Sequence, residues 1–376
     1  MNIAYLSVDD PKDFKSWSGL KLKMLNTIKY LKHRVIIIGP LKNLMRIPFI
    51  INREIYKKVN IKYDSDRKFF LSKIYSAKIN KLIKDKKIDI IFTSDTYLVS
   101  FLNTKIPIIL WLDTTFKTYY EHYFDKIKIH KKSFEEANQL EKLALDKSKK
   151  IILTSKWAKD ETIKNYKISN KKIHILPFGS NLNDMKKNKI KFNNSNLLNL
   201  ISVGVDWDRK GMDKSIKITE YLNKFGVKTT LTIIGSKSKK KYPNFVRQIG
   251  FLNKNIKNDY LKLKKLYLDS DFHILMTQRE ACGVVYAEAN SYGLFNITND
   301  VGGVSGMIKN NFNGKLFNLN TSPKYIASYI YKIFLNKKKF FHLKKKSLEY
   351  YNEKLSWYAN SFHLQKIFSR VLNNDN

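Results

Sequence analysis

The sequence lacks the features that stabilise secreted proteins or hold a protein across a membrane. It has one cysteine, Cys282, in 376 residues, so no internal disulfide can form and a reducing compartment is expected. Its longest apolar runs, Ile47–Ile51 and Ile106–Leu112, fall short of the roughly 18 residues of a spanning helix and fit buried strands or core turns. The first residues, Met1–Leu6, do not resemble a secretory signal. We therefore expect a cytoplasmic protein.

Several motifs that carry chemistry are also missing. The sequence contains no G-x-x-x-x-G-K-[ST], which excludes a P-loop ATPase, and no G-x-S-x-G elbow of a serine hydrolase. Its first loop is not G-x-G-x-x-G, which argues against a dinucleotide cofactor. The seven histidines show no zinc-binding spacing. We therefore expect neither a cofactor nor a bound metal.

Acidic residues are scarce relative to basic ones. Lys and Arg number 71 against 32 Asp and Glu, which gives a net charge of +39. Only 8 of the basic residues are arginine, the residue that reads bases by bidentate contacts, and the lysines are scattered along the chain. No specific nucleic acid is therefore expected. An anionic membrane surface or an acidic acceptor fits better, and a lysine-rich proteome is the alternative explanation.

Apolar runs of strand length alternate with amphipathic stretches along the chain. Nearly continuous Ile, Leu and Val favour parallel strands that are covered on both faces. Such strands are expected at Ile3–Val8, Val35–Gly39, Ile88–Thr93, Ile106–Leu112, Ile151–Thr154 and Ile173–Leu176, and again at Leu197–Val203, Thr229–Ile234, Phe272–Met276 and Phe295–Asn299. The repeated series predicts two doubly wound, Rossmann-like α/β domains, residues 1–180 and 197–355, joined by an Asn- and Lys-rich linker at 181–196.

Two glutamates flank a predicted helix start. Glu280 lies in the loop before a helix that begins at Gly283 and contains Glu288. The first turn offers unpaired backbone N–H groups near Cys282 and Val284, and a helix N-terminus favours negative charge. A diphosphate would therefore fit between two carboxylates, which accept hydrogen bonds from vicinal hydroxyls. Two solvated glutamates beside a surface helix are the alternative.

A basic turn follows another expected strand. Gly204 lies at the end of this strand, and Arg209 and Lys210 precede Gly211 and the next helix. Paired cations at a helix N-terminus can stabilise a departing diphosphate. In a chain so rich in lysine, a plain basic turn is the alternative.

These segments resemble the family 4 retaining glycosyltransferases (glycosyl transferases group 1) of the two-domain GT-B fold, whose domains face each other across a cleft. The stretch from Glu280 to Glu288 resembles the family's E-x7-E signature, with Cys282 where phenylalanine is usual. The resemblance implies that Glu280 contacts the donor sugar, Glu288 the ribose and Lys210 the diphosphate. Val205 stands where many members have arginine, so Arg209 is expected to supply that charge.

Further segments carry the same resemblance. The runs 293–303 and 311–317 are similar to the family's next strand, glycine-rich loop and turn. Gly250-Phe251 is similar to a turn whose backbone meets the base, so Phe251 joins the expected nucleotide-sugar site. Ser356-Trp357 is similar to the start of the last helix, expected at about 356–376, which in the family packs back on the first domain.

The resemblance also places residues of the first domain near the donor phosphates and the acceptor. Gly19 is expected beside the donor, and Trp17 and Ser18 on the acceptor side, with core packing and a helix cap as alternatives. Asp113 follows the strand that ends at Leu112, where ligands bind in open α/β sheets. We expect Asp113 to contact a sugar or acceptor hydroxyl, with a helix cap as alternative and His122 as the nearby candidate.

The implied activity is metal-independent, retaining transfer of a sugar from a UDP- or GDP-sugar to a saccharide or lipid-linked acceptor in surface-glycan biosynthesis. Lysines of the first domain, with the apolar run from Met45 to Ile51, would draw the protein to the inner face of an anionic membrane. Three alternatives remain: a nucleotide-sugar epimerase of the same fold, a non-catalytic basic glycan- or nucleic-acid-binding protein, and a metal-dependent transferase that uses Asp64-Ser65-Asp66 or Asp269-Ser270-Asp271.

Overall fold

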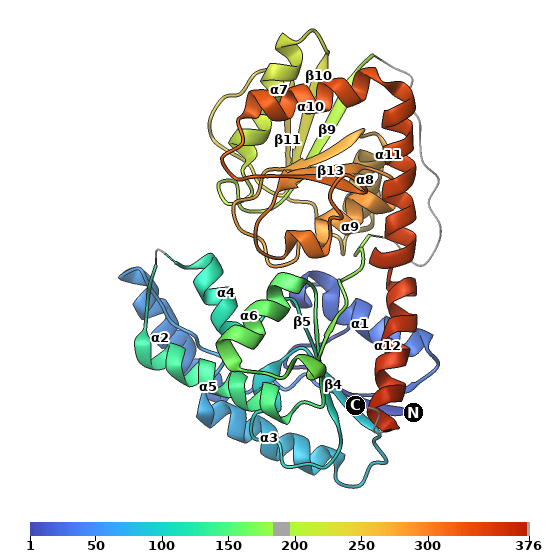
Figure 1. Cartoon of the computed structure of the whole chain (residues 1–376). Helices are drawn as coiled ribbons and strands as arrows, with labels where there is room; N and C mark the ends of the chain where they lie inside the picture. The colour runs from blue at the N-terminus through green and yellow to red at the C-terminus, as the bar shows by residue number, and fades with distance from the viewer. Residues whose placement is uncertain (126, 183–195, 374–376) are drawn as a thin grey trace. The chain divides into compact units, whose positions relative to one another are not determined.

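The computed structural model describes residues 1–125, 127–182 and 196–373 (Figure 1). The chain divides into two compact units of similar size. Unit 1 comprises Met1–Leu176 and the chain from Ser361 onward, and unit 2 comprises Pro177–Asn360. Most of the predicted linker, residues 183–195, lies outside the described residues.

Unit 1 is built on a six-stranded parallel sheet with the order β2-β1-β4-β5-β7-β8. The chain runs from β1 to β2 and then returns to the other side of β1 with β4, so the order reverses between β1 and β4. Ligands of such sheets bind at this switch point, beyond the carboxyl ends of the strands. The strands are β1 (Asn2–Leu6), β2 (Arg34–Ile38), β4 (Ile90–Thr93), β5 (Ile108–Leu112), β7 (Lys150–Leu153) and β8 (Ile173–Ile175).

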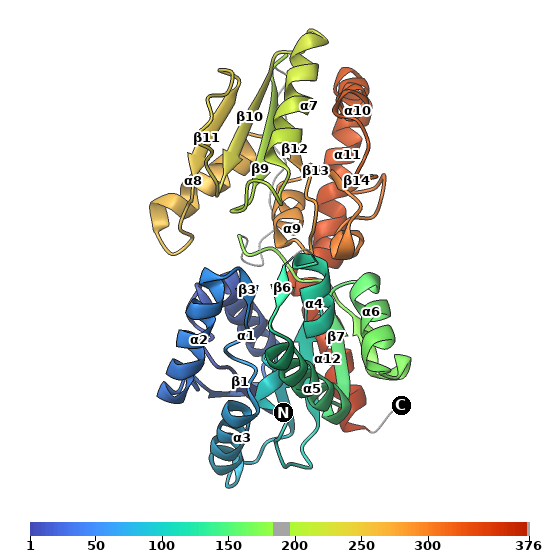
Figure 2. The same ribbon diagram turned by 90° about the vertical axis from the view of Figure 1, so that its left-hand side faces the viewer.

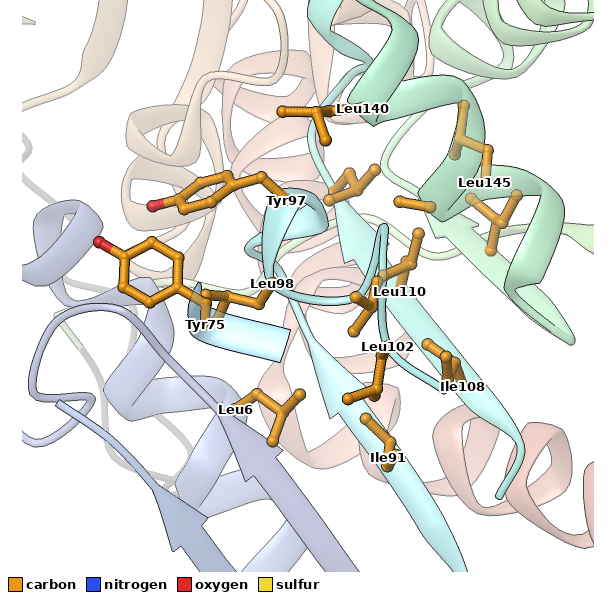
Figure 3. Close-up of a cluster of buried hydrophobic side chains, with 14 of the residues drawn as sticks. Leu6, Tyr75, Ile91, Tyr97, Leu98, Leu102, Ile108, Leu110, Leu140 and Leu145 are labelled. Atoms are coloured by element: carbon orange, nitrogen blue, oxygen red, sulfur yellow. The ribbon is translucent and has the colours of Figure 1, made fainter. Parts of the chain in front are cut away.

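Helices cover both faces of this sheet. On one face, Tyr75 and Leu140 pack with Ile91 and Leu110 of the strands in the core drawn in Figure 3. On the other face, the ring of Phe92 lies 6.2 Å from that of Phe368. The helices are α1 (Leu20–Tyr30), α3 (Phe69–Ile83), α4 (Phe116–Tyr123), α5 (Lys131–Lys147), α6 (Lys156–Tyr166) and α12 (Trp357–Leu372), whose residues from Ser361 belong to this unit.

A helix and a two-stranded ribbon lie at the periphery of unit 1 (Figure 2). They are α2 (Ile47–Lys58) and the parallel pair β3 (Ile61–Lys62) and β6 (Lys128–Ile129). The prediction that Ile47–Ile51 forms a buried strand or core turn is wrong, because this run lies in α2, where no residue is buried. The run is too short for its apolar residues to distinguish a strand from a helix, and Pro48 suits a first helical turn.

Unit 2 repeats the same plan with the strand order β11-β10-β9-β12-β13-β14, all parallel. The order reverses between β9 and β12, so this unit has its own switch point. Its strands are β9 (Leu198–Val203), β10 (Thr229–Ile234), β11 (Val246–Gly250), β12 (Phe272–Leu275), β13 (Phe295–Asn299) and β14 (Gly314–Phe317), and its helices are α7 (Met212–Lys224), α8 (Lys257–Leu268), α9 (Val284–Ser291), α10 (Pro323–Leu335) and α11 (Lys337–Tyr350).

The prediction of two doubly wound, Rossmann-like α/β domains is confirmed by these two sheets. Short helical turns complete the connections: η1 (Ser16–Gly19), η2 (Leu44–Arg46), η3 (Thr96–Leu98), η4 (Asn170–Lys172), η5 (Gly302–Gly306) and the π-helical η6 (Tyr351–Leu355). Within the described ranges, none of the helices combines the length and the apolar character needed to cross a bilayer.

Candidate active site

At the switch point of unit 2, the loop after β9 meets the loop after β12. Lys210 Nζ forms an ion pair with Glu280 Oε2, and both residues are more than nine-tenths buried. Arg209 Nη1 lies 3.8 Å from the same carboxylate oxygen and donates a hydrogen bond to the carbonyl of Arg279 at 3.1 Å. The structure therefore brings together the two cations and the first glutamate that the sequence singled out.

Glycines allow the two loops to pack this closely. A Cβ atom on Gly204 would lie 2.7 Å from Cγ of Lys210, and one on Gly211 would lie 2.0 Å from the carbonyl oxygen of Met276. Gly211 also has a left-handed backbone with φ of +66°. The N–H of Gln278 donates to the carbonyl of Arg209 at 2.7 Å, which joins the loops directly. The position of Lys210 thus depends on backbone contacts that only glycine permits.

We expect Gly211→Ala to destabilise unit 2 more than the matched substitution Gly226→Ala. Both glycines have positive φ, but a Cβ on Gly226 meets nothing within 4 Å. Gly226→Ala should therefore cost only the left-handed backbone strain of about 1–2 kcal/mol. Gly211→Ala adds a collision with backbone that must move. Thermal unfolding of both variants measures the difference, and equal melting temperatures would contradict this account of the loop.

The N-terminus of α9 lies beside the ion pair. Its N-cap is Gly283, with φ of 82° and no side-chain capping bond, and its first turn contains no acidic residue. Gly283, Val284 and Val285 are partly exposed. The first N–H groups of a helix have no partner within it, and the helix dipole favours an anion there. Cys282 is buried with its Sγ atom 3.6 Å from Sδ of Met307, so a ligand would meet its backbone rather than its thiol.

The second glutamate is the most buried charged group of this region. Glu288 is 1% exposed; its Oε1 pairs with Lys254 Nζ, and its Oε2 accepts a hydrogen bond from Tyr267 at 3.3 Å. Burial, and then the charge of Glu288, raise the pKa of Tyr267 well above its ordinary value, so the phenol remains a donor. Phe251 begins the loop that carries Lys254 and is 69% exposed.

Sequence reasoning did not single out Lys254 or Tyr267. Lys254 is one lysine among many, and Tyr267 looks like an ordinary core position of α8. Their contacts with Glu288 join residues 34 and 21 positions away in the chain. A buried glutamate requires partners, so the burial of Glu288 indicates a nearby cation. This burial is known from the structure and not from the sequence.

Unit 1 has a cavity of about 390 Å³ at the carboxyl ends of β1, β4 and β5. Trp17 and Asp113 line it, as does the ion pair in which Lys21 Nζ lies 2.6 Å from Asp95 Oδ2. Asp95 also accepts the N–H of Val8 at 2.9 Å, which ties the ends of β1 and β4 together at the switch point. Sequence reasoning missed this pair because Lys21 lies in an ordinary lysine-rich helical stretch.

The backbone next to this cavity is left-handed over three successive residues. Trp17, Ser18 and Gly19 have φ values of 47°, 55° and 87°. For a non-glycine residue this conformation costs about 1–2 kcal/mol, and such strain tends to occur at functional sites. Gly19, rather than Ser18, is the N-cap of α1, and Ser18 is exposed. His122 lies outside the lining, with its ring 4.9 Å from that of Trp157.

The two aspartates of the first Asp-x-Asp triplet form ion pairs with arginines: Asp64 with Arg67 and Asp66 with Arg46. The Asp64 carboxylate also accepts the backbone N–H groups of Asp66 at 3.0 Å and Arg67 at 2.7 Å. In the second triplet, Asp269 Oδ2 lies 2.6 Å from Lys265 Nζ. Over the residues that the structure describes, no group of three or more His, Cys, Asp or Glu side chains is arranged to hold a metal ion.

Comparison with known proteins agrees with this architecture. The sequence model described as glycosyl transferases group 1 matches residues 184–353, and that of glycosyltransferase family 4 matches residues 24–184. Among solved structures, a glycosyltransferase from Rickettsia africae ESF-5 is similar over 100% of this chain and 99% of its own, with 17% identity and a TM-score of 0.67. A search of curated proteins finds no significant match.

Two further structures are similar over the whole chain. Sucrose-phosphate synthase from Thermosynechococcus elongatus covers 100% of both chains with 13% identity and a TM-score of 0.67. HepE from Anabaena, solved in complex with UDP, covers 98% of this chain and 100% of its own with 15% identity and a TM-score of 0.65. At such identities the likeness concerns the fold.

The two parallel sheets and their structural neighbours define the fold as the two-domain GT-B fold. The two sequence models together span residues 24–353 and give the family. The chain belongs to the group 1 glycosyltransferases and is a glycosyltransferase.

Proposed function

We propose that the protein transfers a sugar, without a metal ion, from a UDP- or GDP-sugar to a saccharide or lipid-linked acceptor, with retention of anomeric configuration. The observation that carries the proposal is the buried Lys210–Glu280 pair beside the glycine-capped N-terminus of α9. Cations and helix N–H groups converge there from two loops of one switch point, which is the chemistry that a departing diphosphate requires.

The donor would bind at the N-terminal end of α9, between Glu280 in the preceding loop and Glu288 in the helix. The diphosphate faces the N-terminus at Gly283 and Val284, with Arg209 and Lys210 as counter-charges. Glu280 contacts the sugar hydroxyls, and Glu288 accepts hydrogen bonds from the ribose, for which Lys254 and Tyr267 orient its carboxylate. Phe251, at the start of the neighbouring loop, would meet the base. HepE has been solved with UDP and glucose, which supports a UDP-sugar as donor.

In the proposed reaction, the bond between the anomeric carbon and the β-phosphate oxygen breaks as a bond to the acceptor oxygen forms. The acceptor hydroxyl passes its proton to the departing phosphate oxygen, and the nucleoside diphosphate leaves with the bonding electrons. Lys210 and Arg209 stabilise the negative charge that develops on the leaving oxygen. Removal of a single preorganised group of this kind raises the activation free energy of an enzymatic reaction by about 2.7–4 kcal/mol.

The cavity of unit 1 is the proposed acceptor site, and its charge differs from that of the whole chain. Around it carboxylates outnumber cations by five to three: Asp9, Asp66, Asp95, Asp113 and Glu141 against Lys21, Arg46 and Arg67. In the sequence, by contrast, basic residues outnumber acidic ones by 71 to 32. Carboxylates accept hydrogen bonds from hydroxyls and repel anions. We therefore propose that the acceptor presents sugar hydroxyls here rather than a phosphate.

One threonine that lines this cavity has an unsatisfied hydroxyl. Among the described residues, Thr114 Oγ1 is buried without a hydrogen-bond partner, and Thr114 lines the cavity. We expect Thr114→Val to raise the acceptor KM and to leave the melting temperature unchanged or higher, because it removes an unsatisfied buried group.

Thr118→Val is the matched control for Thr114→Val. Thr118 Oγ1 bonds to Thr115 Oγ1 at 3.1 Å and to Asn165 Nδ2 at 3.2 Å, so this substitution should lower stability by about 1 kcal/mol. Initial rates at varied acceptor concentration, with thermal unfolding of both variants, provide the comparison. An unchanged KM for Thr114→Val would remove this residue from the acceptor site.

A thermal-shift screen of nucleotide sugars, with and without EDTA, tests the proposed function. One donor should raise the melting temperature of the full chain, and EDTA should leave that shift unchanged. A shift that EDTA abolishes would contradict the metal-independent mechanism, and no shift with any UDP- or GDP-sugar would contradict the proposed donor class.

The family membership favours transfer over the epimerase and the non-catalytic binding protein that the sequence left open. Product analysis separates these cases, since an epimerase would convert the nucleotide sugar in the absence of any acceptor.

We further propose a role in surface-glycan biosynthesis, at the cytoplasmic face of a membrane. WaaG, a glycosyltransferase involved in lipopolysaccharide biosynthesis, has the same fold and supports this role.

A further inference from the structure

The ring of Tyr286 lies directly under the N-terminus of α9. Tyr286 belongs to the first turn of this helix and is 0% exposed. A Cβ atom placed on Gly283, the N-cap, would lie 2.4 Å from Cε2 and 2.6 Å from Cδ2 of the Tyr286 ring. The same Cβ would lie 3.1 Å from Cγ of Glu280. The backbone that begins the helix therefore packs on this ring, next to the first glutamate.

The hydroxyl of Tyr286 fixes the ring to the sheet. It lies 2.8 Å from Oγ1 of Thr298, on β13. Thr298 Oγ1 donates its own proton to the carbonyl of Leu275, on β12, at 2.7 Å, so the tyrosine is the donor in the bond between the two hydroxyls. Burial, and then the charge of Glu280, raise the pKa of Tyr286 above its ordinary value, so the phenol keeps the proton that it donates.

Two further polar side chains hold α9 at the same turn. Asn296 Nδ2 donates to the carbonyl of Tyr286 at 3.3 Å, and Asn296 Oδ1 lies 2.7 Å from Nδ1 of His273. The ring of His273 meets that of Tyr286 edge-on, with centroids 5.6 Å apart. Like Tyr286 and Thr298, both residues are 0% exposed. Hydrogen bonds are directional, and burying polar groups without them is costly, so these contacts specify where the helix lies on the sheet.

We propose that Tyr286 is a positioning residue for the donor: it fixes the first N–H groups of α9 where the diphosphate binds. Because its side chain is buried, Tyr286 acts through Gly283 and does not touch the ligand. Stabilisation of a developing charge depends on donors that are held in place before the reaction, and a hydrogen bond weakens steeply when its geometry is disturbed. The inference rests on the proposed function, which places the diphosphate at this N-terminus.

The hydroxyl distinguishes positioning from core packing. The contacts of the ring with Gly283 and His273 do not involve the hydroxyl, so phenylalanine would serve packing alone equally well. Tyr286→Phe should instead weaken binding of UDP or GDP by about 3- to 10-fold, which corresponds to the loss of one neutral hydrogen bond. Binding of uridine or guanosine, which lack the phosphates, should not change. The donor KM should rise and the acceptor KM should stay the same.

A double-mutant cycle tests the bond itself. Thr298→Val removes the bond from the side of the sheet and should also weaken diphosphate binding. Tyr286→Phe/Thr298→Val should bind no more weakly than either single variant, because both substitutions break the same bond. Tyr166→Phe is the matched control: Tyr166 is 2% exposed in unit 1, donates to Asn138 Oδ1 at 2.7 Å and accepts the N–H of Lys117 at 2.9 Å. It should lower the melting temperature and leave diphosphate affinity unchanged.

Calorimetric titrations of the full chain, below the melting temperature of every variant, provide these affinities. Three results would overturn the positioning role alone: wild-type diphosphate affinity in Tyr286→Phe, an equal loss of nucleoside and diphosphate binding, or additive losses in the double variant. An equal loss of affinity in Tyr166→Phe would likewise assign the effect to stability. If wild-type protein bound neither UDP nor GDP, the proposed function would fail and this role with it.

Discussion

Replacing Lys210 with alanine should lower the turnover number about 10²- to 10³-fold, because the departing diphosphate loses its most closely placed cation. Lys210 is held by Glu280 and by the glycines around it, so its ammonium group is positioned before the reaction begins. Arg209 lies 3.8 Å from the same carboxylate and supplies only part of the lost charge. Steady-state rates with saturating donor and acceptor measure the effect.

Two controls separate catalysis from stability in Lys210→Ala. Lys217→Ala removes a lysine of α7 that pairs with Glu220 at 2.9 Å on the surface, and it should leave the rate unchanged. Removing one partner of a buried ion pair also destabilises the fold, by about 3–5 kcal/mol. Lys210→Met/Glu280→Gln should recover much of that stability and none of the rate. A Lys210→Ala enzyme with wild-type turnover would remove this residue from the mechanism.

Glu288→Ala should weaken binding of the nucleoside diphosphate by about 10- to 150-fold. Hydrogen bonds to a charged group contribute about 1.5–3 kcal/mol, and the proposed ribose contact would be lost with the carboxylate. The buried carboxylate also neutralises Lys254, so the variant leaves this cation without its partner. Fluorescence or calorimetric titration with UDP and GDP measures the loss.

Lys254→Ala distinguishes the role of the Glu288 carboxylate in ligand binding from that of its partner Lys254. Lys254 is 21% exposed at its side chain, so its removal disturbs the buried region less than removal of Glu288. If Glu288 contacts the ribose and Lys254 only orients it, Lys254→Ala should weaken binding less than Glu288→Ala does. Equal losses would assign the ligand contact to Lys254 instead.

Strand patterns predicted all six strands of the first sheet and the four central strands of the second, but not the two edge strands of the second sheet. Runs such as Ile90–Thr93 and Ile108–Leu112 are mostly apolar because both faces of a central parallel strand are covered. The edge strands β11 (Val246–Gly250) and β14 (Gly314–Phe317) were missed, since a half-exposed strand needs no continuous apolar run. The short run at Ile47–Ile51 was assigned to the interior because its residue types alone say nothing about which side faces solvent.

The candidate site, too, could be predicted from the sequence only in part. Glu280 and Glu288 could be singled out because a glycine and a helix start lie between them, which is a local pattern. The partners of each charge are not local: Lys210 lies 70 residues from Glu280, and Lys21 lies 74 residues from Asp95. In a chain with so many lysines, only the folded structure distinguishes the few that are buried from the rest.

Calorimetric titration of the full chain with UDP and GDP in the presence of EDTA tests the central claim most directly. One of the two nucleotides should bind wild-type protein in a one-to-one ratio, and Lys210→Ala/Glu288→Ala should show no measurable binding while remaining folded. Equal affinity in wild type and the double variant, or binding by wild type only when a divalent cation is added, would contradict the claim that these side chains hold the diphosphate and ribose without metal.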